Sequence, residues 1–467
     1  MTMIEFLYPV SVLDCKCVSG ADALLKKQSL QIGMSENCFT EFSNGDYVIL
    51  DFGKEMCGGA RILTYHSKAP RVRLRFGESL GECCSDIGGE KNATNDHALR
   101  DFEVNLSSMS DMTFGNTGFR FLRIDFFGFA RVKSIVARNE ILKRKAAYTY
   151  GGDDALISEI FNTAKRTVDL CASSGYVWDG VKRDRLVWFG DMHPEMLALT
   201  TIYGRMPEIE KSLDFVREQT PLPAWMNGFP MYSMWWIIIL ADYYEKTERR
   251  AFLCRQLDYL ERLVDQMNGC VKDNGELDYP SYFVDWPTHT QPDELDGVRA
   301  INIIAMKKAI SVLEEFGKDS GTARKLLKKL LLIDILPKTS KQVTALKYFA
   351  TELTEEDKKR LVSGGARGMS TFMSYYILKA VASFDKEAAV NMMKQYYGAM
   401  LDKGATTFWE DFDLAWCENS CRIDELATEG QKDIHGDFGA FCYVGFRHSL
   451  CHGWSAGVIR FIEEECN

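Results

Sequence analysis

Three aspartates in one short stretch are the most chemically suggestive feature of this sequence. The stretch reads DGVKRDRLVWFGD and holds Asp179, Asp184 and Asp191 together with Arg183 and Trp188. Carboxylates and cations packed this densely are costly to bury and useful where water is restricted. An apolar wall raises the pKa of a nearby carboxyl group, whereas a paired arginine lowers it. The stretch could therefore keep one carboxyl protonated and another ionised, as general acid–base catalysis requires.

Four further loops combine aromatic residues with acids, amides or histidines. They read WMNGFP, YPSYFVDWPTHTQPDELDG, TTFWEDFD and GFRHSLCHGWSAG, and they include Asp285, Trp286, Trp409, Glu410 and His452. Aromatic faces stack on the C–H faces of sugars, while acids hydrogen-bond to sugar hydroxyl groups. Five such loops together indicate a carbohydrate site. The plainer alternative for residues 179–191 is a knot of arginine–aspartate salt bridges that only holds a loop.

Cleavage of a glycosidic bond needs two carboxyl groups on opposite sides of the bond. Glu410 is the best candidate for a second, distant carboxyl because Phe408 and Trp409 flank it. Within the first stretch, residues 186–188 (Leu-Val-Trp) offer an apolar wall. The sequence does not say which of the three acids meets this wall and which meets an arginine.

Bulk composition limits the class of protein. A chain of 467 residues is too long for one ordinary core, so at least two domains are expected. A net charge of -10 argues against nucleic-acid and anionic-membrane partners. The most apolar run, MWWIIILA, is shorter than the roughly 20 residues that a membrane span needs. The N-terminus lacks the pattern of a secretory signal, so we expect a cytoplasmic protein with reduced cysteines.

The hydrophobic periodicity changes near residue 148. Before it, short β-rich segments such as DYVILDFG and RVRLRFG alternate with turn residues. After it, about a dozen amphipathic helical segments follow one another without intervening strands. The pattern predicts an antiparallel β-sandwich or jelly roll over residues 1–147. It predicts a helical bundle or α/α toroid over residues 148–467.

These motifs resemble those of the α-L-rhamnosidases of glycoside hydrolase family 78. DGVKRDRLVWFGD is similar to the family signature, and DFGKEMCGGARI, RLRFGESLGE, FVDWPT, TTFWE and SLCHGWSAG extend the resemblance in family order. The resemblance implies a β-sandwich followed by an (α/α)6 barrel, and hydrolysis of terminal α-L-rhamnosides with inversion. It implies a rhamnosyl oligosaccharide or glycoside as substrate and neither a metal nor another cofactor. A homodimer is one option for the assembly.

The resemblance also assigns roles to residues. Asp184 stands where the family has its general acid, and Glu410 matches the general base. The matches predicted to line the sugar subsite are Asp179, Arg183, Trp188, Asp191 and His452, joined by Asp285, Trp286 and Trp409 from the aromatic loops. We expect Asp179 and Asp191 to be ionised. The family usually has Glu where this chain has Asp184, so either the site has closed around the shorter side chain or catalysis is altered.

Two other classes of function remain open. A lyase or epimerase on an (α/α)6 barrel would also place acids and histidines around a sugar. A non-catalytic carbohydrate-binding relative would keep Trp188, Trp286 and Trp409 but would not need two opposed acids. Retention of both acids favours the hydrolase. His193, in GDMHPE, is expected to cap a helix or to support the site from behind.

Overall fold

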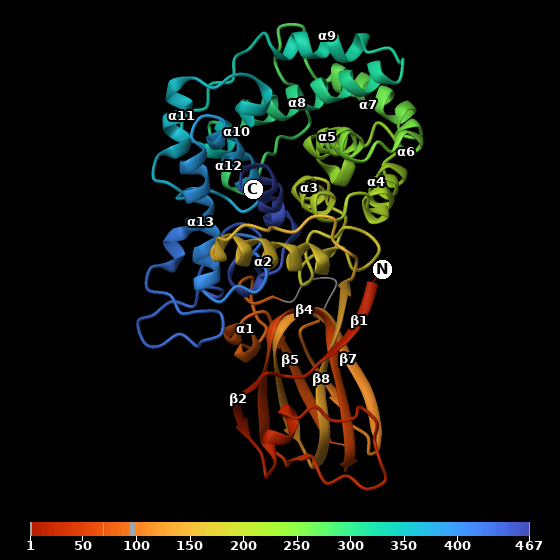
Figure 1. Ribbon diagram of the computed structural model, residues 1–467, viewed down its shortest axis with the longest axis vertical. Helices are drawn as coiled ribbons and strands as arrows, with labels where there is room; N and C mark the ends of the chain where they lie inside the picture. Colours follow the sequence, from red (N-terminus) through yellow and green to blue (C-terminus); the bar gives the residue numbers. More distant parts are fainter. Residues whose placement is uncertain (1, 69, 94–98, 467) are drawn as a thin grey trace.

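The structure is a computed structural model that describes residues 2–68, 70–93 and 99–466. The molecule is elongated, with strands at one end and helices at the other (Figure 1). The last strand, β8, ends at Leu142, and the first helix of the helical part, α2, begins at Ala155. The change in periodicity near residue 148 falls within this interval.

The described part of the chain contains one antiparallel sheet of eight strands. They are β1 (Thr2–Leu7), β2 (Ser11–Lys16), β3 (Thr40–Phe42), β4 (Asp46–Ser67), β5 (Arg71–Gly77), β6 (Asp101–Asn105), β7 (Ser110–Phe127) and β8 (Ala130–Leu142). The order is β1-β8-β4-β7-β5-β6, with β2 paired to β4 and β3 to β8. Two irregularities interrupt the pairing of β4 with β7, and such bulges bend a strand.

Alternation along the strands builds the core of the sheet domain. In β5, Val72, Leu74 and Phe76 are fully buried, whereas Arg71 is exposed. Successive side chains of a strand point to opposite faces of a sheet, so the apolar residues of RVRLRFG face inward. Phe76 packs edge-on against Phe119 of β7, with ring centroids 4.9 Å apart.

Fourteen α-helices lie in the described residues. They are α1 (Leu80–Cys84), which follows β5, and then α2 (Ala155–Cys171), α3 (Met192–Tyr203), α4 (Pro207–Gln219), α5 (Pro230–Thr247), α6 (Arg250–Cys254), α7 (Leu257–Gly269), α8 (Glu294–Glu315), α9 (Gly321–Leu330), α10 (Lys341–Ala350), α11 (Glu355–Val362), α12 (Ser374–Ala382), α13 (Lys386–Asp402) and α14 (Val458–Glu465). Thr354 and Asp357 form the capping box that begins α11.

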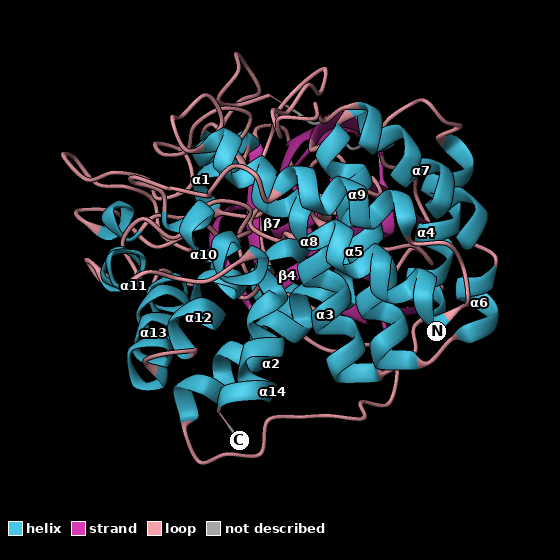
Figure 2. Ribbon diagram, turned by 90° about the horizontal axis from the view of Figure 1, so that it is seen from above, coloured by secondary structure: helices cyan, strands magenta, loops and turns pink. Residues whose placement is uncertain are grey.

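Six helices contact one another in a closed ring. The order of contact is α3, α5, α8, α10, α12, α14 and back to α3. Seen from above, the helices lie over the sheet, and long loops gather along one side (Figure 2). Residues 234–241 of α5 are buried all round, which explains the apolar run MWWIIILA. No described helix has the length and apolar character of a membrane span.

The helical domain rests directly on the sheet through the loop between α2 and α3. Val181 of this loop is fully buried. A Cβ atom at Gly118 of β7 would lie 2.8 Å from a Val181 methyl group, so glycine permits the close approach. All fourteen cysteines lie in described residues and are free.

Candidate active site

A cavity of about 230 Å³ lies where loops of the helical domain meet, and we call it the site cavity. Its lining combines acids, arginines and aromatic rings. The residues are Asp179, Arg183, Asp184, Trp188, Asp191, Phe229, Tyr232, Phe283, Trp286, Glu410, Cys442, Tyr443, Arg447, His452 and Trp454. Segments far apart in the sequence therefore share one cavity, and eight of these residues were predicted from the sequence.

Three carboxyl groups converge on His452 in the site cavity. Its Nε2 atom lies 3.8 Å from Asp179 Oδ2, 3.8 Å from Asp191 Oδ1 and 3.7 Å from Glu410 Oε1. These separations are too long for direct hydrogen bonds. Burial lowers the pKa of His452 to about 4, so the ring is neutral at pH 7. The four groups are close enough to share the hydroxyl groups of one ligand.

Arg183 holds Glu410 in its ionised form. The Arg183 Nε atom donates to Glu410 Oε1 at 3.1 Å, and Nη2 donates to the same oxygen. The amide of Ser449 donates to the other oxygen, Oε2, at 2.9 Å. Burial raises the pKa of this carboxyl, but the Arg183 guanidinium outweighs burial and lowers the pKa to about 2. At neutral pH Glu410 is therefore an anion, the state that a general base requires.

Asp184 occupies a strained turn beside this pair. Its φ angle is 60° and that of Arg185 is 56°, in the left-handed region that residues other than glycine seldom adopt. The Arg185 amide donates to the Arg183 carbonyl at 2.8 Å, which closes a γ-turn around Asp184. Asp184 Oδ2 lies 3.6 Å from Arg183 Nη2, the nitrogen that also contacts Glu410. One guanidinium thus touches both predicted catalytic carboxyls.

Asp179 closes the loop that carries these acids. Its Oδ1 atom accepts a hydrogen bond of 2.7 Å from the Leu186 amide, and its own amide donates to the Leu186 carbonyl at 3.0 Å. Asp179 therefore holds the loop and also lines the cavity. Of the apolar wall predicted from residues 186–188, only Trp188 lines the cavity. Leu186 is 38% exposed and Val187 packs into the helical core.

The pKa values of Asp179 and Asp191 are shifted in the direction opposite to the one expected from the sequence. Burial raises the pKa of Asp179 well above its usual range, and the neighbouring charges of Asp191 and Asp184 add to this. Burial, followed by Glu410 and Asp184, raises the pKa of Asp191 in the same way. Neither carboxyl has a cationic partner as close as the one that Glu410 has. Protonated forms of both are therefore favoured more than we expected.

Several aromatic residues of the site cavity were not singled out from the sequence. Phe229, Phe283 and Trp454 lie in the aromatic loops that predicted a sugar site, yet nothing in those loops distinguished them from core residues. Tyr232 lies in the first turn of α5 and Tyr443 beside Cys442, and neither has a local signal. Trp286 does line the cavity, as predicted, and it stacks on Phe441 with ring centroids 5.5 Å apart.

Two predicted subsite residues lie outside the lining of the site cavity. Asp285 accepts a hydrogen bond from the Thr288 amide at 3.0 Å and one from the Ser370 hydroxyl at 3.1 Å. It therefore caps the short 3-10 helix η3 (Trp286–Thr288) and borders a small neighbouring pocket that also reaches Glu410. Trp409 is 1% exposed. Its side chain packs into the core because that of the next residue, Glu410, enters the cavity.

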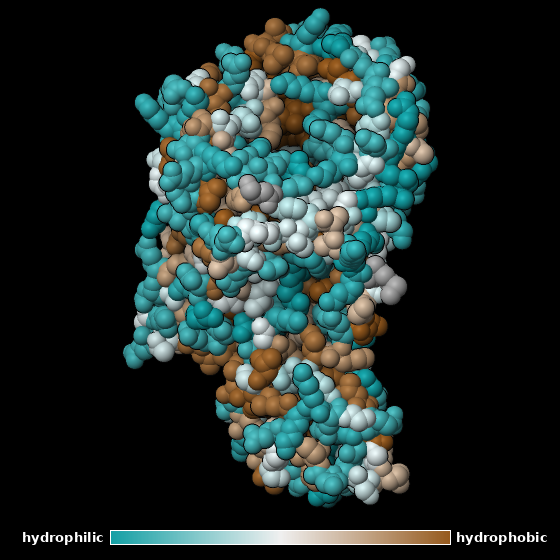
Figure 3. Space-filling model, in the orientation of Figure 1, coloured by the Kyte–Doolittle hydropathy of each residue, from teal (hydrophilic) through white to brown (hydrophobic). Residues whose placement is uncertain are grey.

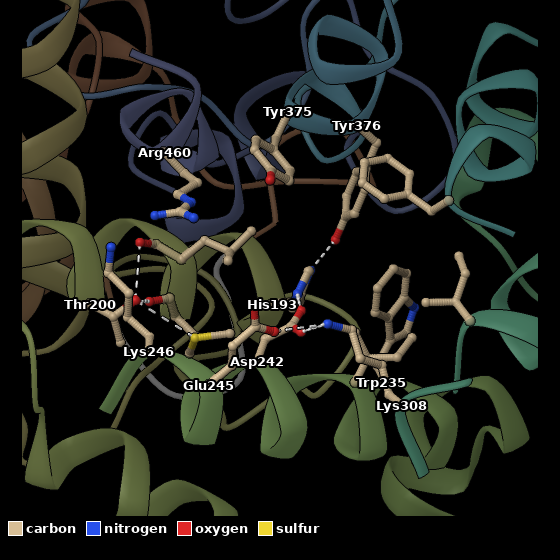
Figure 4. A pocket seen from close by; sticks show the side chains of 15 residues that line it. His193, Thr200, Trp235, Asp242, Glu245, Lys246, Lys308, Tyr375, Tyr376 and Arg460 are labelled. Atoms are coloured by element: carbon tan, nitrogen blue, oxygen red, sulfur yellow. Dashed lines mark hydrogen bonds and ion pairs between the residues drawn. The ribbon is translucent and has the colours of Figure 1, made fainter. Parts of the chain in front are cut away.

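His193 belongs to a second cavity of about 310 Å³, which we call the ring cavity because all six helices of the ring line it (Figure 4). The Nε2 atom of His193 lies 2.9 Å from Asp242 Oδ2, and its Nδ1 atom lies 2.6 Å from the Tyr376 hydroxyl. Lys308 pairs with the other oxygen of Asp242. His193 thus neither caps α3 nor reaches the site cavity. Figure 3 shows an apolar hollow among these helices.

One group of described residues has donor atoms close enough together for a metal ion. It consists of Glu78, Glu82 and His435, all buried. The ammonium group of Lys182 already lies 3.1 Å from one oxygen of each glutamate. A lysine therefore supplies the positive charge that a metal would bring, and these residues do not fit a metal site.

Comparison with solved structures identifies the fold. No protein-family model matches the chain, and no curated protein matches its sequence. The chain is similar to a rhamnosidase from Klebsiella oxytoca with rhamnose bound, with a TM-score of 0.78 and 20% identity over 100% of this chain and 96% of that one. It is also similar to a GH78 family rhamnosidase of Bacillus sp. GL1, with a TM-score of 0.70 and 17% identity over 94% and 48%.

A third similar structure is the Streptomyces avermitilis α-L-rhamnosidase complexed with L-rhamnose, with a TM-score of 0.66 and 17% identity over 89% and 42%. The chain spans less than half the length of the Bacillus and Streptomyces proteins. The resemblance predicted from the motifs is confirmed at the level of fold. The chain has the fold of the α-L-rhamnosidases of glycoside hydrolase family 78.

Proposed function

We propose that the protein is a glycoside hydrolase that removes α-L-rhamnose, or a closely related sugar, from the nonreducing end of an oligosaccharide or glycoside. The observation that carries the proposal is the contact of Asp184 and Glu410 with one guanidinium in a cavity walled by aromatic rings. The structures with rhamnose bound support this class of sugar. The surplus of acids also favours an uncharged sugar over a uronide, because a uronide would be repelled.

We also infer the finer architecture that the family resemblance implies. The closed ring of six helices would be the inner layer of an (α/α)6 barrel over residues 148–467. The eight-stranded sheet would be a jelly-roll sandwich over residues 1–147. Catalytic loops would then lie at one end of the barrel, next to the sandwich.

In the proposed reaction Asp184 is the general acid. It donates its proton to the glycosidic oxygen as the bond between that oxygen and the anomeric carbon breaks. Its side chain is 27% exposed, the most of the four acids in the cavity. This position at the mouth suits contact with a leaving group that extends into solvent. The strained turn fixes its backbone, so little ordering is left for the moment of reaction.

Glu410 is the proposed general base. It takes a proton from a water molecule whose oxygen bonds to the anomeric carbon on the face opposite the leaving group, so the configuration inverts. A carboxylate held by Arg183 is a weak base. We propose that sugar hydroxyl groups draw the guanidinium away from Glu410, which makes the carboxylate more basic when substrate is bound.

Asp179, Asp191 and His452 are proposed to hold the sugar. Protonated carboxyl groups can donate to hydroxyl oxygens as well as accept from hydroxyl hydrogens. The neutral His452 ring is a third such group, because it donates through one nitrogen and accepts through the other. The aromatic rings of Trp188, Trp286 and their neighbours would cover the apolar faces of the sugar.

A panel of nitrophenyl glycosides tests the proposal. We expect the α-L-rhamnoside to have the highest kcat/KM, the α-D-mannoside a lower one, and the α-D-glucoside and uronides almost none. Proton NMR during hydrolysis should show the β-anomer of rhamnose first, as inversion requires. Equal or better turnover of glucosides or uronides contradicts the substrate assignment.

The same panel separates the two rival classes. An unsaturated sugar product would identify a lyase, and a sugar epimer without cleavage would identify an epimerase. Binding of rhamnose in calorimetry without turnover of any glycoside would identify a carbohydrate-binding protein. The α-anomer as first product would keep the hydrolase but replace inversion with retention.

A further inference from the structure

Two glutamates of the sheet domain are buried directly behind the site cavity. Glu78 follows β5 and Glu82 lies in α1, and both are completely shielded from solvent. Lys182, from the loop between α2 and α3, reaches them from the helical domain. Its Nζ atom lies 3.1 Å from Glu78 Oε2 and 3.1 Å from Glu82 Oε1. It also donates to the carbonyl oxygens of Phe446 and His448, at 2.9 and 2.6 Å.

This ion cluster brings two cations to two acids. Burial raises the pKa of Glu78 to about 7, although the charge of Lys182 opposes that shift. The Nε atom of Arg100 lies 3.5 Å from Glu82 Oε1, so two cations face two acids. Burial lowers the pKa of His435 well below its usual range, so this neighbour is neutral. Its Nδ1 atom lies 2.7 Å from the Ser79 hydroxyl. Such a cluster is costly to bury and is stable only while every member keeps its partners.

Glu78 contacts one neighbour of Arg183 and one neighbour of Glu410, the two members of the ion pair in the site cavity. On one side, it pairs with Lys182, which precedes Arg183 in the chain. On the other side, it accepts hydrogen bonds from the Ser449 hydroxyl, at 3.1 Å, and from the Leu450 amide. The amide of the same Ser449 donates to Glu410 Oε2 at 2.9 Å. Glu78 thus contacts both the loop that carries Arg183 and the segment at Ser449 that hydrogen-bonds to Glu410.

The sheet domain also supports the turn that carries Asp184. Arg185, the next residue, donates to the carbonyl and side-chain oxygens of Asn116 in β7, at 2.8 and 3.2 Å. Its guanidinium lies over the Trp178 ring, 4.5 Å from the centroid. Left-handed backbone at two successive residues is strained, and it persists only where the surroundings hold it. The sheet domain therefore contacts the loop that carries Asp184 and Arg183, and it contacts the segment at Ser449 that holds Glu410.

We propose that Glu78 is a positioning residue, and that through Lys182 and Ser449 the sheet domain sets the geometry of Arg183 and Glu410. The sheet domain is then an integral part of the active site and not a separate carbohydrate-binding module. Glu78 does not line the site cavity, so its effect must pass through its partners. The catalytic readouts of this inference rest on the proposed hydrolase function, whereas the structural readout below does not.

The variants Glu78→Gln and Lys182→Met test the proposal, with Lys347→Met as the matched control. Lys347 and Asp357 form a buried ion pair of 2.7 Å between α10 and α11, outside the site cavity. We expect all three variants to lower the melting temperature, because each removes one charged partner from a buried ion pair or cluster. Only the first two should lower kcat for the aryl rhamnoside, by about 10- to 100-fold, with KM within about threefold. Lys182→Arg should recover most of the kcat that Lys182→Met loses.

The double variant of Glu78 and Lys182 sharpens the test. Since both residues act through one contact, the double variant should lose no more kcat than the worse single variant. Independent roles would instead multiply the two losses. Unchanged kcat in Glu78→Gln and Lys182→Met, with melting temperatures lowered as in the control, would reduce the cluster to domain adhesion and overturn the proposal.

Hydrogen exchange measured by mass spectrometry tests positioning without any activity. In Glu78→Gln we expect faster exchange in residues 179–186 and 446–453, and no change there in Lys347→Met. Wild-type protein that hydrolyses no rhamnoside, combined with faster exchange in Glu78→Gln, would defeat the proposed function and leave the positioning role intact. Unchanged exchange in both segments would defeat the positioning role alone.

Discussion

The site cavity and the ring cavity both bring charged side chains together among aromatic rings, and they differ in how those charges are balanced. In the ring cavity, one oxygen of Asp242 meets Lys308 and the other meets His193. Burial alone would raise the pKa of Asp242, but these two partners lower it. In the site cavity, four acids line the wall together with Arg183 and Arg447, and Arg183 contacts Asp184 and Glu410.

This difference distinguishes a cavity that stabilises the fold from one that can bind a ligand. Acids that are buried without cationic partners destabilise a fold, so they persist where a ligand will use them. Asp179 and Asp191 have raised pKa values, whereas Asp242 has a lowered one. The ring cavity is the larger of the two, yet its polar groups already satisfy one another. Cavity size alone would therefore point to the wrong place for chemistry.

Substitution of Glu410 gives the largest expected effect on the site side of this comparison. Glu410→Gln keeps the shape but cannot take a proton from water. We expect kcat to fall by about 10² to 10⁴ for natural and activated rhamnosides alike. External azide, which needs no deprotonation, should restore turnover of an activated substrate. A kcat within about threefold of wild type would remove Glu410 from the role of general base.

Asp184→Asn should have an effect that depends on the leaving group. Loss of a proton donor matters most when the departing oxygen is basic. We expect a fall of about 10² to 10⁴ in kcat for natural rhamnosides and much less for nitrophenyl rhamnosides. The measurement is a series of aryl rhamnosides with leaving groups of increasing pKa, for which the variant should show a steeper dependence than wild type. An equal loss across the series would indicate a role other than proton donation.

The ring cavity should respond in the opposite way. Asp242→Asn removes the carboxylate that contacts both His193 and Lys308. We expect a loss of about 3 kcal/mol in the free energy of unfolding. We expect kcat to stay within about threefold of wild type. Glu245→Gln is the control, because Glu245 contacts the same Lys308 but its side chain is 77% exposed. Urea unfolding and rhamnosidase assays on both variants measure the contrast. A large loss of kcat in Asp242→Asn at unchanged stability would make the ring cavity part of the active machinery.

Much of this contrast could be predicted from the sequence, because the signals were local. The period of the apolar residues predicted strands before residue 148 and helices after it, and the dense motif at residues 179–191 predicted the acids around Arg183. Motif order also predicted that Glu410 and His452, far away in the sequence, would join them. These groups can be recognised from residue type and spacing alone.

Other features depended on partners that no local pattern reveals. The pairing of Lys182 with Glu78 joins residues about a hundred positions apart, and neither belongs to a pattern that requires the other. The direction of Trp409 into the core and of Glu410 into the cavity is set by packing. The partners of His193 are Asp242, two helices later, and Tyr376, so its place in the ring cavity was not predictable. The raised pKa of Asp191 likewise follows from burial, which the sequence does not specify.

The substitution Asp191→Asn has the smallest expected effect, and it tests the contrast between the two cavities most directly. Burial, then Glu410 and Asp184, raises the pKa of this carboxyl in the folded protein, while the unfolded value is about 3.9. Because the folded pKa is the higher one, the group costs stability once the pH exceeds the unfolded pKa, and the cost grows until the pH reaches the folded pKa. We therefore expect Asp191→Asn to be more stable than wild type by about 1 kcal/mol at pH 7. The difference should shrink toward zero below about pH 4.

The same measurement on Asp242→Asn should have the opposite sign. The folded pKa of Asp242 is lowered, so its contribution stabilises the fold above the unfolded value of about 3.9 and fades as the pH falls through the folded pKa. Urea unfolding at several pH values between 7 and 4 would compare the two variants directly. Asp191→Asn should bind rhamnose more weakly despite its greater stability, because the acid is kept for the ligand. If Asp191→Asn were less stable than wild type at pH 7, Asp191 would be a structural group like Asp242, and the contrast between the two cavities would fail.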